Sequence, residues 1–314
     1  MTPLRKRNEV SIKVKRETDL EKVNKRVKQG IKEPATAKVL FVFLVIYAVM
    51  LLYPYTVALN GAFRTWGSFT DNIFALKDFT FDNFKRVLTE FSYPVTLPDG
   101  TPAAYYFGGM LLNSILYAGG CALAGCTCPM IVGYCTARFP NRFSKFLIDM
   151  VYVLMALPIV GKIGSEIEIT QKLGLYNSIP GIWFLKFHFL GMYTLIYHAN
   201  FKTMAKEYFE AAYMDGASHF TIFFKIMLPL VTKTWTICFL LQFISYWSSY
   251  SDALYFLPDK PTLALALLNF NKLPASTETM QLAAAFLIAI PSLTLFALFK
   301  DKFVTNIQTG GIKG

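Results

Sequence analysis

Long apolar segments constrain this chain more than any other feature. A helix needs about 20 apolar residues to cross roughly 30 Å of hydrocarbon. Runs near that length predict membrane spans at about 39–59, 106–134, 146–160, 179–199, 235–256 and 282–299. Polar residues interrupt the third run at Asp149 and the fourth at Lys186 and His188. The pattern predicts an all-α polytopic membrane protein with about six transmembrane helices.

The composition excludes an ordinary soluble domain. Of the 314 residues, 54% are hydrophobic and only 16% are charged, whereas soluble domains carry about 25% charged residues. Three of the five cysteines, Cys121, Cys128 and Cys135, recur at every seventh position. On a helix, neighbours at that spacing lie about 10.5 Å apart. We therefore expect buried thiols, and neither a metal site nor a disulfide.

The placement of the positive charges predicts the orientation. The formal net charge is +11, from 31 Lys and Arg against 20 Asp and Glu. With a cytoplasmic N-terminus, 22 of the 31 basic residues lie inside, as the positive-inside rule requires. We expect both termini inside, a basic cytoplasmic head at 1–38 and a transmembrane domain at 39–314. The head either binds anionic membrane lipid or only orients the chain, and no motif predicts nucleic-acid binding.

One predicted cytoplasmic segment, at about 202–230, carries a specific pattern. Residues 202–215 contain no Gly or Pro and predict a short helix. Gly216 is suited to end this helix, since glycine adopts the left-handed conformation that most residues avoid. Ser218 is suited to cap a second short helix at 219–227, and Pro229 lies close to the start of the next long helix. The sequence predicts two short helices joined at a glycine corner.

The side chains of this segment suit a protein partner. The small residues Ala211 and Ala212 let another backbone approach closely. Glu210 offers a carboxylate that a basic residue of a partner can bind. Apolar contact is offered by Phe209, Tyr213 and Met214. A generic amphipathic loop is the alternative interpretation, and the complete string of residues favours a docking surface.

The segment resembles the EAA loop of inner-membrane permeases of binding-protein-dependent ABC importers. That loop has the pattern EAA, a glycine four residues after the last alanine, and I-x-L-P about nine residues later. Here Gly216, Ile226 and Pro229 stand in register with the Glu-Ala-Ala string at 210–212. The loop resemblance is specific, and weaker resemblance covers about residues 38–314.

Other pieces resemble the sugar-importing branch of the maltose-transporter type, and its second permease subunit in particular. They include Asn113-Ser114 in the second predicted span, Trp247 in the fifth, Pro291 in the sixth and the Gly-Gly-Ile-Lys-Gly terminus. The chain departs from the branch at Ser248, because such permeases often have Trp-Asn where this chain has Trp-Ser. The resemblance implies a carbohydrate substrate, an oligosaccharide in preference to a monosaccharide.

The resemblance implies that the loop is a coupling helix docking in a cleft of a cytoplasmic ATPase. Glu210 would pair with a basic residue of that ATPase. Ala211 and Ala212 would form the close-packed face, and Gly216 the corner. The full set of implied coupling residues is Glu210, Ala211, Ala212, Asp215, Gly216, Ala217, Leu228 and Pro229.

The resemblance also implies partners and a location. A second permease subunit would complete a heterodimer, two ATPase subunits would drive it, and an extracytoplasmic solute-binding protein would deliver the substrate. The chain contains no G-x-x-x-x-G-K-[ST] string, so ATP and Mg are expected on the ATPases. We expect no catalytic residue, metal site or cofactor in this chain, and a place in the cell membrane of a prokaryote.

An aromatic and polar cluster in the fifth predicted span is a candidate for the substrate pathway. Aromatic faces suit the apolar C–H patches of sugar rings, although Tyr and Trp also anchor helices at membrane interfaces. The predicted pathway residues are Asn113, Tyr246, Trp247 and Tyr250, with Asp252 nearby. Asp149, His188 and His198 either line the pathway or are structural.

Two other classes of function compete with the importer. A gradient-driven secondary transporter would show paired broken helices and intramembrane acidic relays, of which the sequence has little sign. A polytopic membrane enzyme would need a constellation of His, Asp, Glu or Cys at one membrane depth, and the chain has only three histidines. An importer permease is therefore the prediction, and the secondary transporter its alternative.

Overall fold

The computed structural model describes residues 35–96, 99–157, 161–270 and 276–309, with the backbone alone at 35 and at 301–309. Contacts group the chain into two units, residues 1–58 and 59–314. The predicted basic head lies outside the described residues except for its last four. The described part of the first unit belongs to α2 (Ala35–Ala62), a 28-residue helix that is apolar on all sides. Such a helix suits a membrane span, and it confirms the first predicted segment as a helix.

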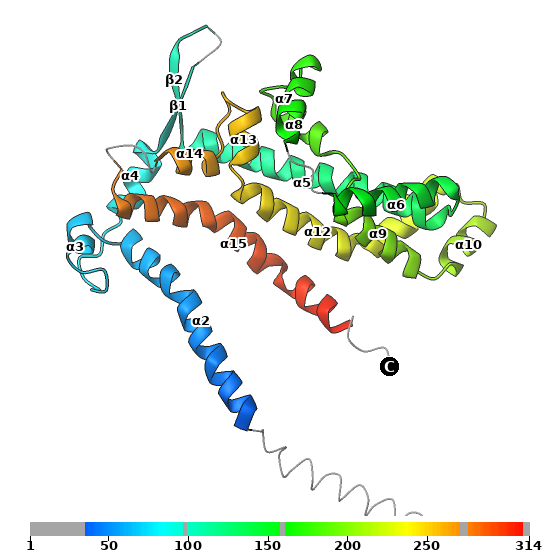
Figure 1. Cartoon of the computed structure of the whole chain (residues 1–314), viewed down its shortest axis with the longest axis horizontal. Helices are drawn as coiled ribbons and strands as arrows, with labels where there is room; N and C mark the ends of the chain where they lie inside the picture. The colour runs from blue at the N-terminus through cyan, green and yellow to red at the C-terminus, as the bar shows by residue number, and fades with distance from the viewer. Residues whose placement is uncertain (1–34, 97–98, 158–160, 271–275, 310–314) are drawn as a thin grey trace, which may run out of the picture. The chain divides into compact units, whose positions relative to one another are not determined.

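Three further helices of the described chain are long and apolar enough to cross a membrane. They are α5 (Phe107–Arg138), α12 (Leu228–Ser248) with the turns that precede it, and α15 (Glu278–Thr309). In Figure 1 α5 runs through the second unit, and it packs against α12 and against α9 (Met192–Thr203). The second and sixth predicted segments are confirmed as helices. The fifth begins earlier than predicted and ends at Ser248.

The third and fourth predicted segments differ from single long helices. The third is α6 (Arg142–Ala156), of only 15 residues, and residues 158–160 after it lie outside the described chain. The fourth consists of α8 (Ile179–Lys186) and α9, separated at 187–191. A continuous fourth helix was therefore a wrong prediction. The Thr194 hydroxyl of α9 donates to the Phe189 carbonyl in the break. Six spans, and their orientation, stay predictions.

Short elements cover the end of the second unit where α5 begins. They are α3 (Trp66–Asp71), α4 (Asp82–Glu90), β1 (Ser92–Thr96) and β2 (Pro102–Tyr106). The strands pair antiparallel with Ser92 opposite Tyr106, which adds one hairpin to the predicted all-α fold. Two hydrogen bonds from Thr101 hold the pKa of the Asp99 carboxyl in the hairpin turn below its usual value. Elsewhere in this unit lie α7 (Lys162–Lys172), α13 (Ser251–Phe256) and α14 (Leu263–Phe270).

Two clusters of buried side chains share α5. One joins the first half of α5 to α8, α12, α14 and α15, and includes Tyr117, Cys121 and Trp247. The other joins the second half of α5 to α9 and α12, and includes Cys126 and Tyr197. Cys121, Cys126, Cys128 and Cys238 are buried free thiols, as the sequence predicted. Cys135 is exposed, so the prediction of burial was wrong for this residue. The second cluster, which we call the inner cluster, supports the candidate coupling site.

Candidate functional site

The predicted two-helix loop is present, with different helix bounds. Its first helix is α10 (Glu207–Met214), which begins five residues later than predicted because α9 continues to Thr203. Its second part is α11 (His219–Ile222) followed by a π-helical turn, η1 (Phe223–Met227). We call residues 207–227 the two-helix loop. In Figure 1 α10 lies near the end of α5, and the β-hairpin lies near its start.

The second short helix is not separate, because helix continues from His219 through Ser248. Pro229 lacks an N–H, and its ring would clash with the carbonyl four residues earlier in a regular α-helix. The wider π-turn directly before it relieves this conflict. The prediction of a short helix that ends at residue 227 was therefore wrong, and the second part of the loop continues directly into α12.

The glycine corner has the geometry that the sequence predicted. Gly216 has φ +77°, in the left-handed region. The Gly216 N–H donates to the Tyr213 carbonyl and the Ala217 N–H to the Ala212 carbonyl, each at 3.0 Å. This pair of hydrogen bonds is a Schellman motif, which satisfies the last carbonyls of α10. Ser218 caps the next helix, since its Oγ accepts from the Thr221 N–H at 3.2 Å.

The inner cluster anchors the two-helix loop, because several side chains of the loop are part of it. Ala212, Ile222, Phe223 and Met227 are buried within it. The Tyr134 ring of α5 lies 4.8 Å from Phe223 and 5.3 Å from Phe201 of α9, between ring centroids. Ala212 therefore packs inside this chain, which differs from the expectation that both alanines face a partner. These contacts join the loop to α5 and α9 in one packed cluster.

The outer surface of α10 is open and carries the carboxylate. Glu210 and Ala211 are exposed, and Met214 is 84% exposed. No ion pair of Glu210 occurs within the described residues. Asp215 is exposed at the corner, whereas Leu228 packs against the inner cluster and Pro229 is exposed beyond the loop. Glu210, Ala211 and Asp215 are thus accessible, whereas Ala212 and Leu228 pack into or against the inner cluster.

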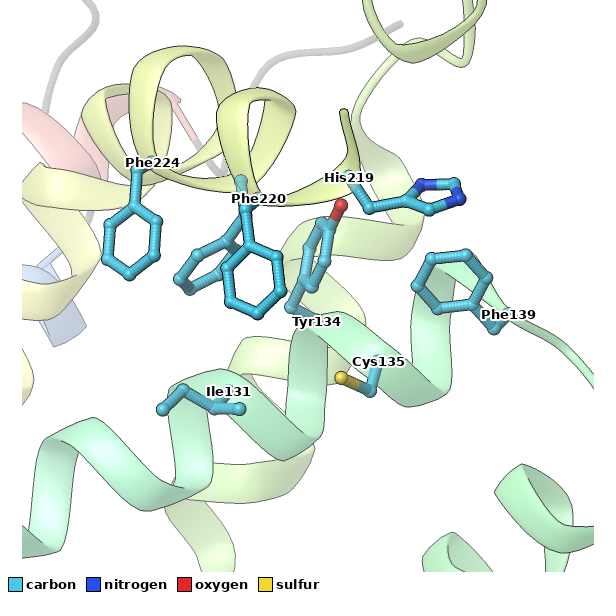
Figure 2. A pocket seen from close by; sticks show the side chains of 8 residues that line it. Ile131, Tyr134, Cys135, Phe139, His219, Phe220 and Phe224 are labelled. Carbon is cyan, nitrogen blue, oxygen red and sulfur yellow. The ribbon is translucent and has the colours of Figure 1, made fainter. Parts of the chain in front are cut away.

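Stacked rings hold the two halves of the loop together. Phe209, Tyr213 and His219 stack with centroids 5.7–6.4 Å apart, and Phe139 meets His219 edge-on at 5.4 Å. Figure 2 shows the adjoining apolar cavity, of about 280 Å³, between the C-terminal end of α5 and the start of α11. Its lining includes Ile131, Tyr134, Cys135, Phe139, His219, Phe220 and Phe224. Sequence reasoning missed Phe139, because only the fold brings the end of α5 to the loop.

The four predicted pathway residues do not lie together. The Asn113 Nδ2 donates to the Pro261 carbonyl at 3.1 Å, and the Ser114 Oγ accepts from the Leu263 N–H at 2.8 Å. Both bonds fasten the start of α14 to α5. Asn113 therefore has a partner within the chain, which favours a structural role over contact with substrate.

Trp247 and Tyr250 line a larger cavity of about 460 Å³ between α12, α14 and α15. Trp247 is only 3% exposed, its Nε1 donates to the Ile288 carbonyl at 2.9 Å, and its ring stacks on Phe243. The Ser292 hydroxyl, also in the lining, is buried and has no hydrogen-bond partner among the described residues. A ligand hydroxyl can supply that partner. We call this the larger cavity.

Tyr246 lines a different, smaller cavity of about 240 Å³ where the fourth predicted segment breaks. Polar side chains converge on this smaller cavity from α12, from α9, from the end of α8 and from the break between α8 and α9: Lys186, His188, Tyr193 and Gln242. The Gln242 Nε2 donates to the Cys126 sulfur at 3.0 Å. Amide, phenol and imidazole groups beside an aromatic ring suit a hydroxyl-rich ligand.

An ion pair adjoins the smaller cavity, and sequence reasoning did not assign it. The Lys186 Nζ lies 2.8 Å from the Asp252 Oδ2, and the Tyr117 hydroxyl donates to the same oxygen at 2.9 Å. The Lys186 Nζ also lies 5.7 Å from the centroid of the Tyr246 ring. Both charged residues stand out in the sequence, but they lie far apart along the chain, so the sequence does not show that they form a pair.

The remaining polar candidates separate in the structure. His188 lines the smaller cavity, whereas Asp149 is exposed on α6. The His198 Nδ1 lies 2.9 Å from the Thr136 hydroxyl oxygen, which joins α9 to α5. Of these three residues, His188 has the position that fits a pathway.

Comparison with known proteins identifies similar chains. A family model described as "Binding-protein-dependent transport system inner membrane component" matches residues 129–306. The maltodextrin transport system permease protein MdxG of Bacillus subtilis is 26% identical over 281 residues, which are 87% of this chain and 95% of that protein. The melibiose/raffinose/stachyose import permease protein MelC of the same organism is 23% identical over 291 residues, which are 88% of this chain and 97% of that protein.

A solved structure has the same fold. It is a chain of a bacterial ABC transporter involved in the import of the acidic polysaccharide alginate, with a TM-score of 0.72 and 20% identity. The match covers 85% of this chain and 96% of that one.

Proposed function

Since the chain belongs to the family of binding-protein-dependent transport system inner membrane components, we propose that it forms half of the transmembrane pathway of a carbohydrate importer. It is a multi-pass permease subunit of the bacterial inner membrane. A second permease subunit completes the pathway, two cytoplasmic ATPases drive it, and an extracytoplasmic solute-binding protein delivers the substrate. The single observation that carries the proposal is the two-helix loop, with its exposed Glu210 above a buried anchor.

The loop suits transmission of force from an ATPase to the helices. Glu210 and Ala211 meet the ATPase, where a basic residue pairs with the carboxylate. The Gly216 corner and the ring stack keep α10 at a fixed angle to α11. Because Ala212 is packed into the inner cluster, displacement of α10 moves α5, α9 and α12 together. ATP and Mg are bound by the ATPase subunits, and this chain contributes no cofactor site.

A carbohydrate substrate is supported by the relatives' names and by the two cavities. The two relatives reported above are named for maltodextrin and for melibiose, raffinose and stachyose, and oligosaccharide is our choice over monosaccharide. The larger cavity offers Trp247, Tyr250 and an unpartnered hydroxyl of Ser292. The smaller cavity offers Tyr246 and Gln242. Aromatic faces with a few hydrogen-bonding groups are what sugar rings require.

One observation favours the alternative, a gradient-driven secondary transporter. The break between α8 and α9 and the Lys186–Asp252 pair are features that such transporters use for ion coupling. The exposed loop of this chain has no role in that mechanism.

Reconstituted transport decides between the two. The chain, its second permease subunit and its ATPases are placed in vesicles with the solute-binding protein, and uptake of radiolabelled maltotetraose and raffinose is measured. We expect uptake with ATP and none with a proton or sodium gradient alone. Uptake driven by an ion gradient without ATP would support the secondary transporter and contradict the proposal.

A further inference from the structure

We infer that this chain's half of the pathway accepts electrically neutral carbohydrate and rejects sugars that carry carboxylates. The inference rests on the carbohydrate function proposed above and adds the charge class of the substrate. It is carried by the charge balance of the smaller cavity, where the one cation already has a partner.

Among the described residues that line the smaller cavity, only Lys186 carries a full charge. Its ammonium lies 2.8 Å from the Asp252 carboxylate, and the two side chains are only 16% and 20% exposed. Attraction between opposite charges is strong where water is largely excluded. The Tyr117 hydroxyl, at 2.9 Å, fixes the same carboxylate oxygen. The Asp252 carboxylate is therefore held by both Lys186 and Tyr117, and the net charge of the Lys186–Asp252 pair is zero.

A sugar carboxylate would disturb this balance. It would either share one ammonium with Asp252 or separate the pair, and each choice leaves a poorly compensated charge in a half-buried site. A neutral sugar needs only hydrogen bonds and ring faces, which Gln242, Tyr193 and Tyr246 supply. The larger cavity has no charged residue in its described lining. Both cavities therefore suit neutral ligands.

The fold does not decide the charge of the substrate. A transporter of the same fold imports alginate, an acidic polysaccharide. Side chains within a shared fold set ligand chemistry, so the compensated Lys186 is the informative feature of this chain.

Matched sugar pairs test the inference. The first pair is maltotetraose and the same tetrasaccharide oxidised at C6 to the tetraglucuronate, and the second is methyl-esterified trigalacturonate and free trigalacturonate. Binding to the purified complex of both permease subunits and the ATPases is measured by equilibrium dialysis. The solute-binding protein is omitted, so that its own selectivity does not enter. The assay runs at pH 8.0, above the ordinary imidazole pKa of about 6.5, so that His188 stays neutral.

We expect the unaltered complex to prefer the neutral member of a pair by at least about tenfold, because a poorly compensated charge costs more than 1.4 kcal/mol. Asp252→Asn frees the Lys186 charge while keeping an oxygen for the Tyr117 hydroxyl, and it should shift the preference about tenfold toward the uronate. Asp259→Asn is the matched control. Asp259 pairs with Asn177 outside the cavity lining, and its replacement should leave the ratio unchanged.

Three outcomes have distinct meanings. Equal binding of neutral and acidic members by the unaltered complex would overturn the inference while leaving the carbohydrate function intact. An unchanged ratio in Asp252→Asn, in a complex that still elutes as one assembly, would also overturn it. Binding of no sugar from either pair would refute the carbohydrate cavity itself, and with it the proposed substrate.

Discussion

Gly133→Ala is the substitution that most directly tests how α5 supports the two-helix loop. A Cβ added at Gly133 would lie 2.7 Å from the Tyr197 Cβ, 2.9 Å from the His198 nitrogen and 3.1 Å from the Tyr197 carbonyl carbon. Two of these three atoms belong to the backbone of α9, so no side-chain rotation can relieve the contact. The two helices would have to separate beside Tyr197, which belongs to the inner cluster.

The expected cost follows from overpacking. An extra methyl group in a tight interior costs about 1–3 kcal/mol. Separation of the helices would also stretch the contact between His198 and the Thr136 hydroxyl, now 2.9 Å. A loss of 1 kcal/mol lowers the unfolding midpoint by roughly 2–4 °C in proteins of 150–250 residues. We expect a decrease of several degrees and weaker ATP-dependent uptake.

The same helix supplies the control. Gly119 has no heavy atom within 4 Å of an added Cβ, and alanine is the better helix former by about 0.5–1 kcal/mol. Gly119→Ala should be neutral or slightly stabilising. Thermal unfolding of the two variants in lipid nanodiscs, followed by tryptophan fluorescence, gives the comparison. Equal midpoints for Gly133→Ala and Gly119→Ala would refute the close packing of α5 on α9.

Three other substitutions test separate parts of the account. Gly216→Ala should lower the free energy of unfolding by about 1–2 kcal/mol, because φ is +77° at this position. Gly216→Asn should lower it less, and the rate of proteolysis at the corner measures the effect of both substitutions. Trp247→Phe should lower the unfolding midpoint through loss of the hydrogen bond to the Ile288 carbonyl, worth about 1 kcal/mol; an unchanged midpoint would contradict this packing role. Ser114→Ala leaves the buried Leu263 N–H without its acceptor and should cost about 1–3 kcal/mol, and hydrogen exchange at the start of α14 should rise.

Local signals of the sequence predicted the long helices and the corner of the loop. The apolar run of α5 needs no tertiary information, because lipid imposes a helix on any segment of that length. Gly216 and Ser218 likewise act on their own backbone neighbours, and the structure confirms both. The start of α10 was predicted too early, since nothing local shows that α9 continues to Thr203.

Features that depend on distant contacts were not predictable. The break of the fourth segment at 187–191 and the Lys186–Asp252 pair bring together residues from different helices. The four predicted pathway residues do not lie together for the same reason: consecutive positions on α12 face different cavities, so Tyr246 and Trp247 separate. Burial of Ala212 beside an exposed Ala211 also requires the fold, because the two differ only in which face of α10 they occupy.

ATPase binding by charge-reversed variants tests the central claim, that the two-helix loop couples this chain to an ATPase. Glu210→Lys reverses the exposed carboxylate of α10, and Glu168→Lys makes the same change on exposed α7 as a control. The complex is purified through a tag on this chain, and the ATPase that remains bound is quantified together with ATP-dependent uptake. The account predicts that Glu210→Lys loses most of the ATPase and uptake while staying in the membrane, and that Glu168→Lys retains both. Full ATPase binding and uptake by Glu210→Lys would contradict the account.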